Sequence, residues 1–317
     1  MSNNLKGSFM LLVAAVIWGS AFVAQEEACK FIGSFTLNSM RSFVGALVLI
    51  PVVLIFKKSR EKQSGQKEKT LTKPLIIGGI CCGIALSVAA NLQQFGIIFN
   101  AELSEGGSGK AGFITAMYII FVPLISMFTG KRVRISVILG VIIAVLGLYF
   151  ISVKDGFTVS RGDIVLLLCA VAFSGHIMII DRFVSRVNGV AMSCIQFFTV
   201  GIVSGVLMLI FERDSLSVYN LLHAAVPILF CGVLSSGIAY TLQILSQKLC
   251  EPTVASLVMS LESVFAMVTA CVFYLVLPTG REFVGCVLMM IAIFLVETPF
   301  ADKFFDKFFK RSIKNAD

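Results

Sequence analysis

The amino-acid sequence predicts an all-α integral membrane protein in which ten transmembrane helices form two inverted five-helix repeats. Hydrophobic residues make up 57% of the 317 residues and charged residues 14%, and the mean hydropathy is +0.95. A soluble domain is about half apolar and about a quarter charged. The apolar residues fall into ten runs separated by polar breaks, and about 20 apolar residues cross a bilayer core about 30 Å thick. A weak internal similarity divides these runs into two sets of five.

The two sets of spans define the expected domains: a first repeat over 1–154, a second over 155–299, and a basic amphipathic tail over 300–317. The only long polar connection, 57–73, separates the second and third spans. The other breaks carry the charged and turn-forming residues that mark loops. The expected spans are 8–24, 35–56, 74–99, 111–130 and 137–153, followed by 164–183, 190–211, 221–249, 252–277 and 283–296.

Lysine and arginine are distributed unequally between the two sides of the predicted bundle. With a cytoplasmic N-terminus, 19 of the 26 lysine and arginine residues lie in cytoplasmic segments, six lie in outer segments, and Arg41 lies within the second span. The positive-inside rule then places both termini in the cytoplasm. In the tail, phenylalanine and lysine alternate at helical spacing, which predicts a helix in the membrane interface; a disordered basic tail is the alternative. We expect a multi-pass protein of the cytoplasmic membrane.

Two segments of the first half resemble two segments of the second. Residues 87–97 and 110–124 align with 237–247 and 254–268, which places Gln94 opposite Gln243 and Tyr118 opposite Glu262. Because five is an odd number of spans, the second copy must be inverted in the membrane relative to the first. Inverted repeats are the architecture of secondary carriers, whose substrate site lies near the midplane between the repeats. The sequence therefore predicts a central cavity.

Glu262 is the strongest candidate for that cavity. An acid in a membrane helix is costly to hold in hydrocarbon, so it should face the bundle interior or water and mark a pathway. A carboxylate held for packing by neighbouring hydroxyl groups is the alternative. Polar stripes on other spans give further cavity candidates: Asn91 and Gln94 on the third, Thr115 and Tyr118 on the fourth, and Tyr240 and Gln243 on the eighth. Such side chains also bond neighbouring helices in membranes, and that explanation stays open.

Three further residues have competing explanations. His176, midway along the sixth span, could contact a substrate carboxylate or, like Glu262, take part in proton coupling, because histidine changes charge near neutral pH; a hydrogen-bonded core histidine is the alternative. Trp18 either lines the cavity or lies at the membrane interface. Arg41 lies near the start of its span, and a side chain that reaches back to the interface explains it more simply than a role in transport.

Other functional classes lack the residues that they need. Seven of the nine cysteines lie in apolar runs and none forms a C-x-x-C pair, so we expect no disulfide, metal site or cofactor. The segment GGSGKA at 106–111 lacks the first glycine and the final Ser or Thr of a phosphate-binding loop. No hydrolase motif is present, so we expect no enzyme. The formal net charge of +8 fits loops that meet anionic lipid, and we expect no nucleic-acid partner.

The sequence resembles members of the drug/metabolite transporter superfamily, EamA-type family. The resemblance covers nearly the whole chain and is carried by WGSAFVAQ, FTLNSMRSFVGAL, GKAGFITAMYIIFVPL, SSGIAYTLQILSQK and EPTVASLVMSLESVFA. It implies a ten-helix transporter with two inverted five-helix repeats around a central cavity, which moves small metabolites, often amino acids or related compounds. After the ninth span the family usually has a Gly-Glu pair where this chain has Leu275-Val276, so no role of that acid is carried over.

We therefore expect a secondary transporter that moves an amino acid or a related zwitterionic or neutral compound by alternating access, with export favoured. Pro123 in the fourth span is a candidate hinge or a fixed kink. A nucleotide-sugar or organophosphate exchanger is one alternative, although it would need several basic residues at the midplane. A receptor or scaffold that moves no solute is another. The expected partners are a small-molecule substrate and the lipid bilayer, with the chain acting as a monomer or a homodimer.

Overall fold

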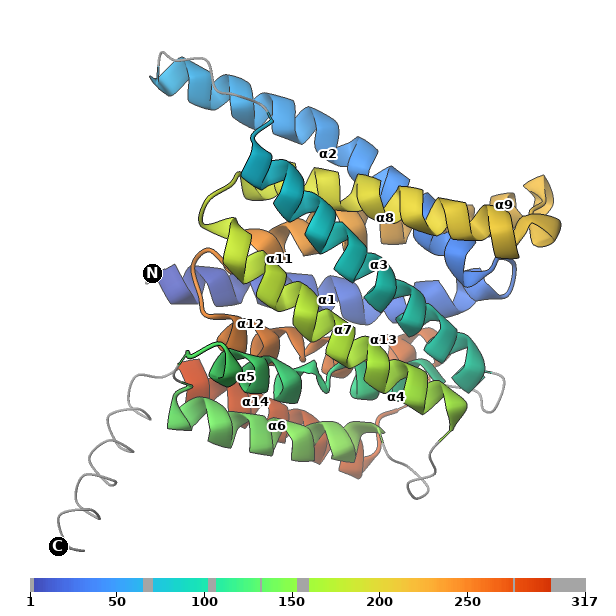
Figure 1. Cartoon of the computed structure of the whole chain (residues 1–317). Coiled ribbons are helices and arrows are strands. Elements are labelled where there is room, and N and C mark those ends of the chain that lie inside the picture. Colours follow the sequence, from blue (N-terminus) through green and yellow to red (C-terminus); the bar gives the residue numbers. More distant parts are fainter. Residues whose placement is uncertain are drawn as a thin grey trace, which may run out of the picture.

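The computed structural model of the chain describes residues 3–64, 71–101, 107–131, 133–152, 160–275 and 277–297. Within these ranges every regular element is a helix, and the long helices pack into one bundle (Figure 1). The expected tail over 300–317 lies outside the described residues. Eight stretches are long and apolar enough to cross a membrane: Asn4–Cys29, Ser34–Ser59, Lys73–Asn100, Ala111–Phe128, Arg161–Val184, Gly189–Phe211, Ala225–Ser246 and Pro252–Phe273.

The helices of the first half are α1 (Asn3–Cys29), α2 (Ser34–Ser64), α3 (Lys73–Ala101), α4 (Gly107–Thr115), α5 (Tyr118–Phe128) and α6 (Ile135–Ser152). The expected fourth span is therefore two short helices, α4 and α5. α2 continues past its expected end at residue 56 into the polar connection, where Lys57 Nζ lies 3.7 Å from Glu61 Oε1 one turn further on. Such pairs favour helix outside the membrane by a few tenths of a kcal/mol, about 0.2–0.5.

The second half comprises α7 (Arg161–Val184), α8 (Gly189–Phe211), α9 (Val218–His223), α10 (Ala225–Phe230), η2 (Cys231–Ala239), α11 (Tyr240–Ser246), α12 (Pro252–Met259), α13 (Glu262–Tyr274) and α14 (Gly280–Glu297). η2 is a π-helix between α10 and α11, so the eighth span is wider in its middle than a regular helix. A capping box begins α7: Asp163 N–H donates to Ser160 Oγ at 3.1 Å, and Ser160 N–H donates to Asp163 Oδ2 at 2.8 Å. Two orphan amide donors are satisfied in this way.

α6 and α14 occupy the places of the fifth and tenth expected spans. The apolar part of α6 is the 17-residue stretch Ile135–Ile151, and α14 has 18 residues. The two helices lie side by side (Figure 1). They approach closely at a pair of glycines: a Cβ atom on Gly147 would lie 2.8 Å from Gly285 O, and one on Gly285 would lie 2.6 Å from Gly147 O. Small residues permit this kind of backbone contact between membrane helices.

The contact between Gly147 and Gly285 leaves no room for a side chain. We predict that Gly285→Val lowers the apparent melting temperature of the purified protein in detergent, because α14 must move away from α6 at a cost of about 1–3 kcal/mol. Gly280→Ala is the matched control, since nothing lies within 4 Å of a Cβ atom built on Gly280. Equal melting curves for the two variants would contradict the described α6–α14 packing.

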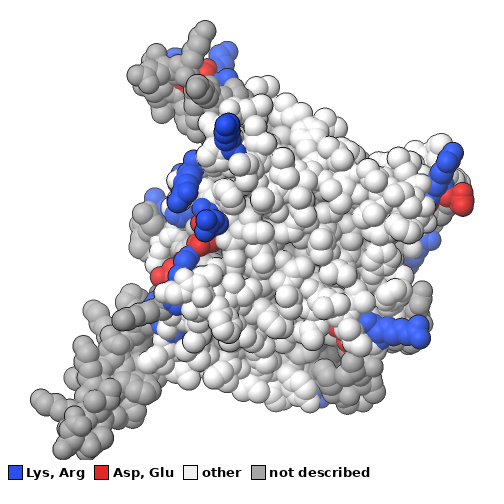
Figure 2. Space-filling view, in the orientation of Figure 1, with Lys and Arg blue, Asp and Glu red and all other residues white. Residues whose placement is uncertain are grey.

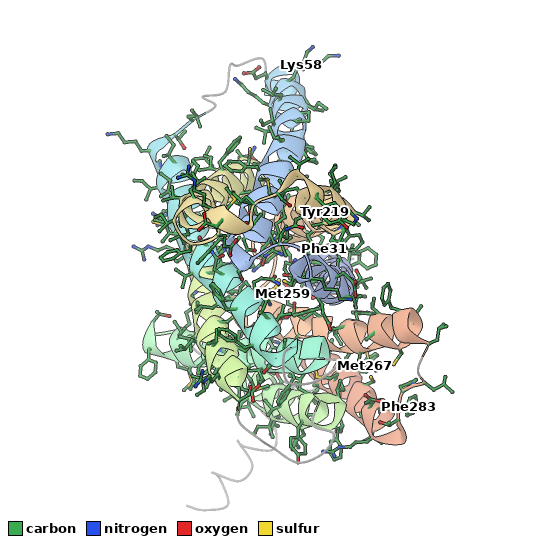
Figure 3. The ribbon with its side chains drawn as sticks, turned by 90° about the vertical axis from the view of Figure 1, so that its right-hand side faces the viewer. Phe31, Lys58, Tyr219, Met259, Met267 and Phe283 are labelled. Carbon is green, nitrogen blue, oxygen red and sulfur yellow. The ribbon has the colours of Figure 1, made fainter. Side chains whose placement is uncertain are left out.

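Apolar side chains cover the outside of the bundle, and polar ones gather inside it. Val272, Phe294 and Ile55 are about two-thirds exposed, whereas Gln196 and His176 are fully buried. Figure 2 shows charged residues at two opposite ends and a wide band without them in between. In Figure 3 Met259 lies near the middle of the bundle, while Lys58 and Phe283 lie at its periphery. This distribution is the one expected of a protein surrounded by lipid.

Leu275 ends α13 in the left-handed conformation, with φ 56° and ψ 38°. A leucine there costs roughly 1–2 kcal/mol because its Cβ approaches the following carbonyl, whereas glycine has no such cost. Glycine also loses more conformational entropy on folding, which offsets part of this gain. We therefore predict that Leu275→Gly raises the free energy of unfolding by roughly 0.5–1 kcal/mol. Leu277→Gly should stabilise nothing, since Leu275 is the only non-glycine with positive φ in the described ranges. A higher melting temperature for Leu277→Gly than for Leu275→Gly would contradict this assignment.

Candidate functional site

The fourth and ninth spans break at corresponding positions. In the register that pairs Tyr118 with Glu262, the break between α4 and α5 coincides with the break between α12 and α13. The same hydrogen bonds bridge both breaks: Ala116 N–H to Gly112 O and Met117 N–H to Ile114 O in the fourth span, and Ser260 N–H to Ser256 O and Leu261 N–H to Val258 O in the ninth. Each break is thus one tightened turn.

Tyr118 and Glu262 are the first residues of the helices that follow the two breaks, and they contact each other. The Tyr118 hydroxyl donates to Glu262 Oε1 at 2.9 Å. Both residues are buried, at 4% and 5% exposure, and Oε1 is the only Glu262 oxygen with a hydrogen bond from the described residues. The bond joins the helix that follows the first break to the helix that follows the second.

The Tyr118–Glu262 pair borders a narrow central cavity with about 30 Å³ accessible to a water-sized molecule. Its polar lining consists of Gln25, Arg41, Gln93, Thr115, Tyr118, Ser235, Gln243 and Glu262, and its other lining consists of Trp18, Phe22, Phe173, Ile177, Tyr240 and Met259. These residues come from the first, second, third, fourth, sixth, eighth and ninth spans. Sites that combine apolar walls with convergent polar groups are typical of small-molecule binding.

Aromatic side chains form one wall of the cavity around Tyr240. The Trp18 ring meets the Tyr240 ring edge-on with 4.8 Å between centroids, and its indole Nε1 is buried without a hydrogen-bond partner in the described residues. Gly19 permits this placement, because a Cβ atom there would lie 2.7 Å from Ala266 N on α13. Of the two explanations for Trp18, the structure thus supports the cavity wall.

Arg41 is buried beside the cavity, which contradicts the explanation that it reaches back to the interface. Its side chain is 5% exposed, and Nη1 donates to Gln25 Oε1 at 3.0 Å. Arg41 lies about two turns into α2, and Gln25 on the neighbouring α1 turns its side chain inward. The sequence position suggested proximity to the interface, but the contact with α1 decides the orientation.

Asn91 does not line the cavity, contrary to prediction. Its Nδ2 donates to Ser87 O at 2.8 Å and to Ser204 Oγ at 3.0 Å. Its Oδ1 accepts from Asn38 Nδ2 at 3.0 Å. These bonds join α3 to α2 and α8, so Asn91 has the role of a link between membrane helices.

Gln94 also lies away from the cavity, and its neighbour Gln93 takes the expected place. Gln94 Nε2 donates to Cys29 Sγ at 2.6 Å, whereas Gln93 and Gln243 both line the cavity. The segment alignment 87–97 with 237–247 in fact pairs Gln243 with Gln93, so the predicted pairing with Gln94 was wrong by one residue. One residue is about 100° of rotation on a helix, which is enough to turn a side chain from one helix neighbour to another.

His176 is a buried histidine behind the cavity wall. Its Nε2 lies 2.9 Å from Gln196 Oε1, and its ring lies 6.1 Å from the Tyr240 ring. His176 is fully buried and is not among the lining residues, so the structure does not place it in contact with a substrate. A histidine bonded to a neighbouring helix was the alternative explanation, and the geometry favours it.

Six predicted residues line the cavity, and eight lining residues were not predicted. The predicted ones are Trp18, Thr115, Tyr118, Tyr240, Gln243 and Glu262; the others are Phe22, Gln25, Arg41, Gln93, Phe173, Ile177, Ser235 and Met259. A signal for three of these was present, because Phe22 follows Trp18 on the first span at the same four-residue spacing that separates Phe173 and Ile177 on the sixth. Apart from this spacing, the apolar residues that line the cavity have the same residue types as the ordinary core, so the sequence does not distinguish them.

A second cleft, with about 690 Å³ accessible to water-sized molecules, opens at the end of the bundle where α1 begins. Lys131 Nζ and Asp181 Oδ2 form an ion pair at its rim, joining the segment after α5 to α7. A short hydrogen-bonded chain separates this cleft from the central cavity: Gln243 Nε2 donates to Gln247 Oε1 at 3.3 Å, and Gln247 Nε2 donates to Ile177 O at 3.0 Å. A polar floor thus lies between the two spaces.

Comparison with known proteins identifies related sequences and a related fold. The model of the EamA-like transporter family matches residues 5–153 and again residues 160–298. An uncharacterized transporter of Archaeoglobus fulgidus is 27% identical over 295 residues, which are 93% of this chain and 86% of that protein. The uncharacterized transporter YoaV of Bacillus subtilis is 24% identical over 73% of this chain and 75% of its own. A protein crystal structure that is 17% identical superposes with a TM-score of 0.73 over 92% of this chain and 96% of its own, which shows the fold alone.

Proposed function

Because the chain belongs to the EamA-like transporter family, we propose that it is a secondary transporter that exports a small zwitterionic or neutral metabolite across the cytoplasmic membrane. The observation that carries this proposal is the Tyr118–Glu262 hydrogen bond, which joins matched helix breaks at a central cavity. Discontinuous membrane helices at the interface of two repeats are where secondary carriers hold their substrates. A cavity between the halves also supplies the site that alternating access requires.

In this proposal the ten helical segments span the membrane as two inverted repeats, with both termini in the cytoplasm. The packing supports a two-fold relation between the halves. The second span (α2) contacts the seventh (α8), and the fifth (α6) contacts the tenth (α14). The contact of the third span with the sixth (α3 with α7) corresponds to the contact of the eighth span with the first (η2 and α11 with α1). Each contact maps onto itself or onto its counterpart when the halves are exchanged. The excess of lysine and arginine in the segments on the side of the N-terminus supports the orientation.

Alternating access then consists of movement of one half against the other around the cavity. The Tyr118–Glu262 bond crosses the interface of the halves at its centre, and the Lys131–Asp181 ion pair crosses it at the rim of the second cleft. The ion pair must separate or re-form as that side opens and closes. Glu262 is the candidate for proton coupling, since it is the one carboxylate among the lining residues of the cavity and protonation lowers the cost of burying it.

The organophosphate exchanger remains a weaker candidate. Its substrates carry at least two negative charges at neutral pH, for which several basic residues are needed. Arg41 is the only lysine or arginine among the residues that line the cavity, and Glu262 opposes its charge. A solute with balanced charges suits this lining better.

Flux measured with purified protein tests the proposal. The full chain is reconstituted into vesicles loaded with a panel of amino acids, amines, organic acids, sugars and vitamins, and release of each compound is followed with and without a pH gradient. We expect protein-dependent release of at least one zwitterionic or neutral compound above that of empty vesicles. A protein that binds none of the panel and releases none would contradict a transport function. A pH gradient that alters neither rate nor direction would argue against proton coupling.

A further inference from the structure

A further cleft, which we call the basic groove, opens at the same end of the bundle as the second cleft. It has about 510 Å³ accessible to water-sized molecules. Its lining comes from the end of α2, the beginning of α3, the connection from α7 to α8 and the end of α11 with the residues after it. These helix ends lie on the side where α1 begins (Figure 1), and Figure 2 shows several lysine and arginine residues on the surface there. In the proposed orientation this side faces the cytoplasm.

The charged side chains that line the basic groove are all cations among the described residues: Lys57, Arg186 and Lys248. They come from three separate parts of the chain, so the fold brings them to one space. Lys57 Nζ lies 3.7 Å from Glu61 Oε1, which offsets part of one charge. Arg186 and Lys248 are exposed and form no ion pair within the described part of the chain. An anion between these like charges would relieve their repulsion.

The beginning of α8 adds backbone donors to the basic groove. Asn188 Oδ1 accepts from Ala191 N–H at 3.1 Å and thereby caps one amide of the first turn. The N–H groups of Gly189 and Val190 precede that amide and have no acceptor inside the helix, since the first turn of a helix lacks one. Both residues line the groove. Free N–H groups and the helix dipole favour an anion at such a place.

The rest of the lining is largely apolar: Val53, Phe56, Leu75, Val184, Val187, Val190, Ala191 and Leu245. This wall continues onto the outer surface of α2, where Ile55 is 67% and Phe56 53% exposed. A soluble phosphate compound has no acyl chain to place against such a wall. A phospholipid presents both a phosphate and an acyl chain at this depth, and basic pockets between membrane helices on the cytoplasmic side bind anionic lipid headgroups.

We propose that the basic groove binds an anionic phospholipid of the cytoplasmic leaflet, with its phosphate held by Arg186 and Lys248 and an acyl chain against the apolar wall. The guanidinium of Arg186 has the planar fork that matches two phosphate oxygens, and Lys248 contributes a point charge. The groove and the central cavity share no lining residue. The proposal therefore goes beyond the transport function and does not depend on it.

Lipid retention by the purified full chain tests the proposal. Protein in an uncharged detergent is mixed with equal amounts of dioleoylphosphatidylglycerol and dioleoylphosphatidylcholine, and the lipids that stay bound are counted by native mass spectrometry. The acyl chains are identical, so the ratio of the two lipids reports the headgroup. We expect about tenfold more phosphatidylglycerol than phosphatidylcholine. Arg186→Gln and Lys248→Gln should each lower this ratio about fivefold, and Arg186→Lys should lower it less.

Arg182→Gln is the matched control for Arg186→Gln. It removes the same charge from an exposed residue one turn earlier, and Arg182 does not line the groove, so the ratio should stay unchanged. Glycerol 3-phosphate distinguishes the two sources of a phosphate, because it has the phosphate without the acyl chains. At the same concentration as the lipid it should displace none. Since Arg186 and Lys248 are exposed, their variants should unfold at the melting temperature of the unaltered protein.

Three results would overturn the proposal. Equal retention of both lipids by the unaltered protein would show no recognition of an anionic headgroup. A ratio that falls as far in Arg182→Gln as in Arg186→Gln, or that stays unchanged in the Arg186→Gln/Lys248→Gln double variant, would assign the preference to the surface charge as a whole. Displacement of the lipid by glycerol 3-phosphate would make the groove a site for a soluble phosphate compound. The transport function stands in each case, because it is tested by flux.

Discussion

Replacement of Glu262 by glutamine should reduce flux by at least about tenfold, because a charged contact at the cavity is worth roughly 1.5–3 kcal/mol. The carboxamide has nearly the shape of the carboxylate and can still accept the hydroxyl of Tyr118, which now lies 2.9 Å from Oε1. The variant should therefore fold with a melting temperature close to that of the unaltered protein. Flux from reconstituted vesicles and thermal unfolding in detergent measure the two effects.

The matched control for Glu262→Gln is Glu212→Gln. Glu212 accepts hydrogen bonds from Phe35 N–H at 2.9 Å and from Thr36 N–H at 2.7 Å, so it caps the start of α2, and it is not among the residues that line the cavity. Its replacement should lower the melting temperature and leave flux per folded molecule unchanged. Retained substrate binding with lost flux in Glu262→Gln would assign Glu262 to coupling, and loss of both would assign it to recognition. Full flux in Glu262→Gln would contradict a role for the cavity.

A covalent link between the two halves should stop transport. Lys131 and Asp181 form an ion pair across the rim of the second cleft, so cysteines at both positions can be joined by a short bifunctional thiol reagent. Cys250 lines the same cleft and must first be replaced by serine. Because alternating access requires the halves to move apart at one side, we predict that cross-linking lowers flux by more than about tenfold and that cleavage of the link restores it.

A link inside one helix provides the control for the cross-link. Lys57 and Glu61 lie one turn apart on α2, and joining cysteines at these positions restrains no movement between the halves. Flux should survive that modification. Undiminished flux in the fully cross-linked Lys131→Cys/Asp181→Cys protein would contradict movement of α7 against the segment after α5.

Hydropathy and charge predicted the positions of the helices well, because the lipid environment acts on each span separately. The helix breaks were not predictable in this way. Ala116-Met117 and Ser260-Leu261 contain neither glycine nor proline, and Pro123 lies inside α5, beyond the first break. The equivalent residue in the second half is Met267 on α13, and the ninth span breaks at the corresponding place although it has no proline there. Pro123 is therefore not required for the break, and tertiary contacts between the halves are what the two breaks share.

The candidate site was predictable where a polar residue has a single plausible neighbour. Glu262 and Tyr118 followed from the repeat and from the cost of a carboxylate in lipid. The roles of Arg41, Asn91 and His176 depend on partners on other helices, namely Gln25, Asn38 and Gln196. Periodicity gives the face of a helix but not the helix that it meets, so these assignments required the packed structure.

The most direct measurement of the central claim is thiol labelling of Gln243→Cys, a cavity position, in a variant without native cysteines. A membrane-impermeant reagent is applied to sealed vesicles in both orientations, with Val272→Cys on the exposed apolar surface as the control. If one cavity opens alternately to each side, the reagent labels Gln243→Cys from either side and leaves Val272→Cys unlabelled. Labelling from neither side, or from one side under every condition, would contradict a central cavity shared by two moving halves.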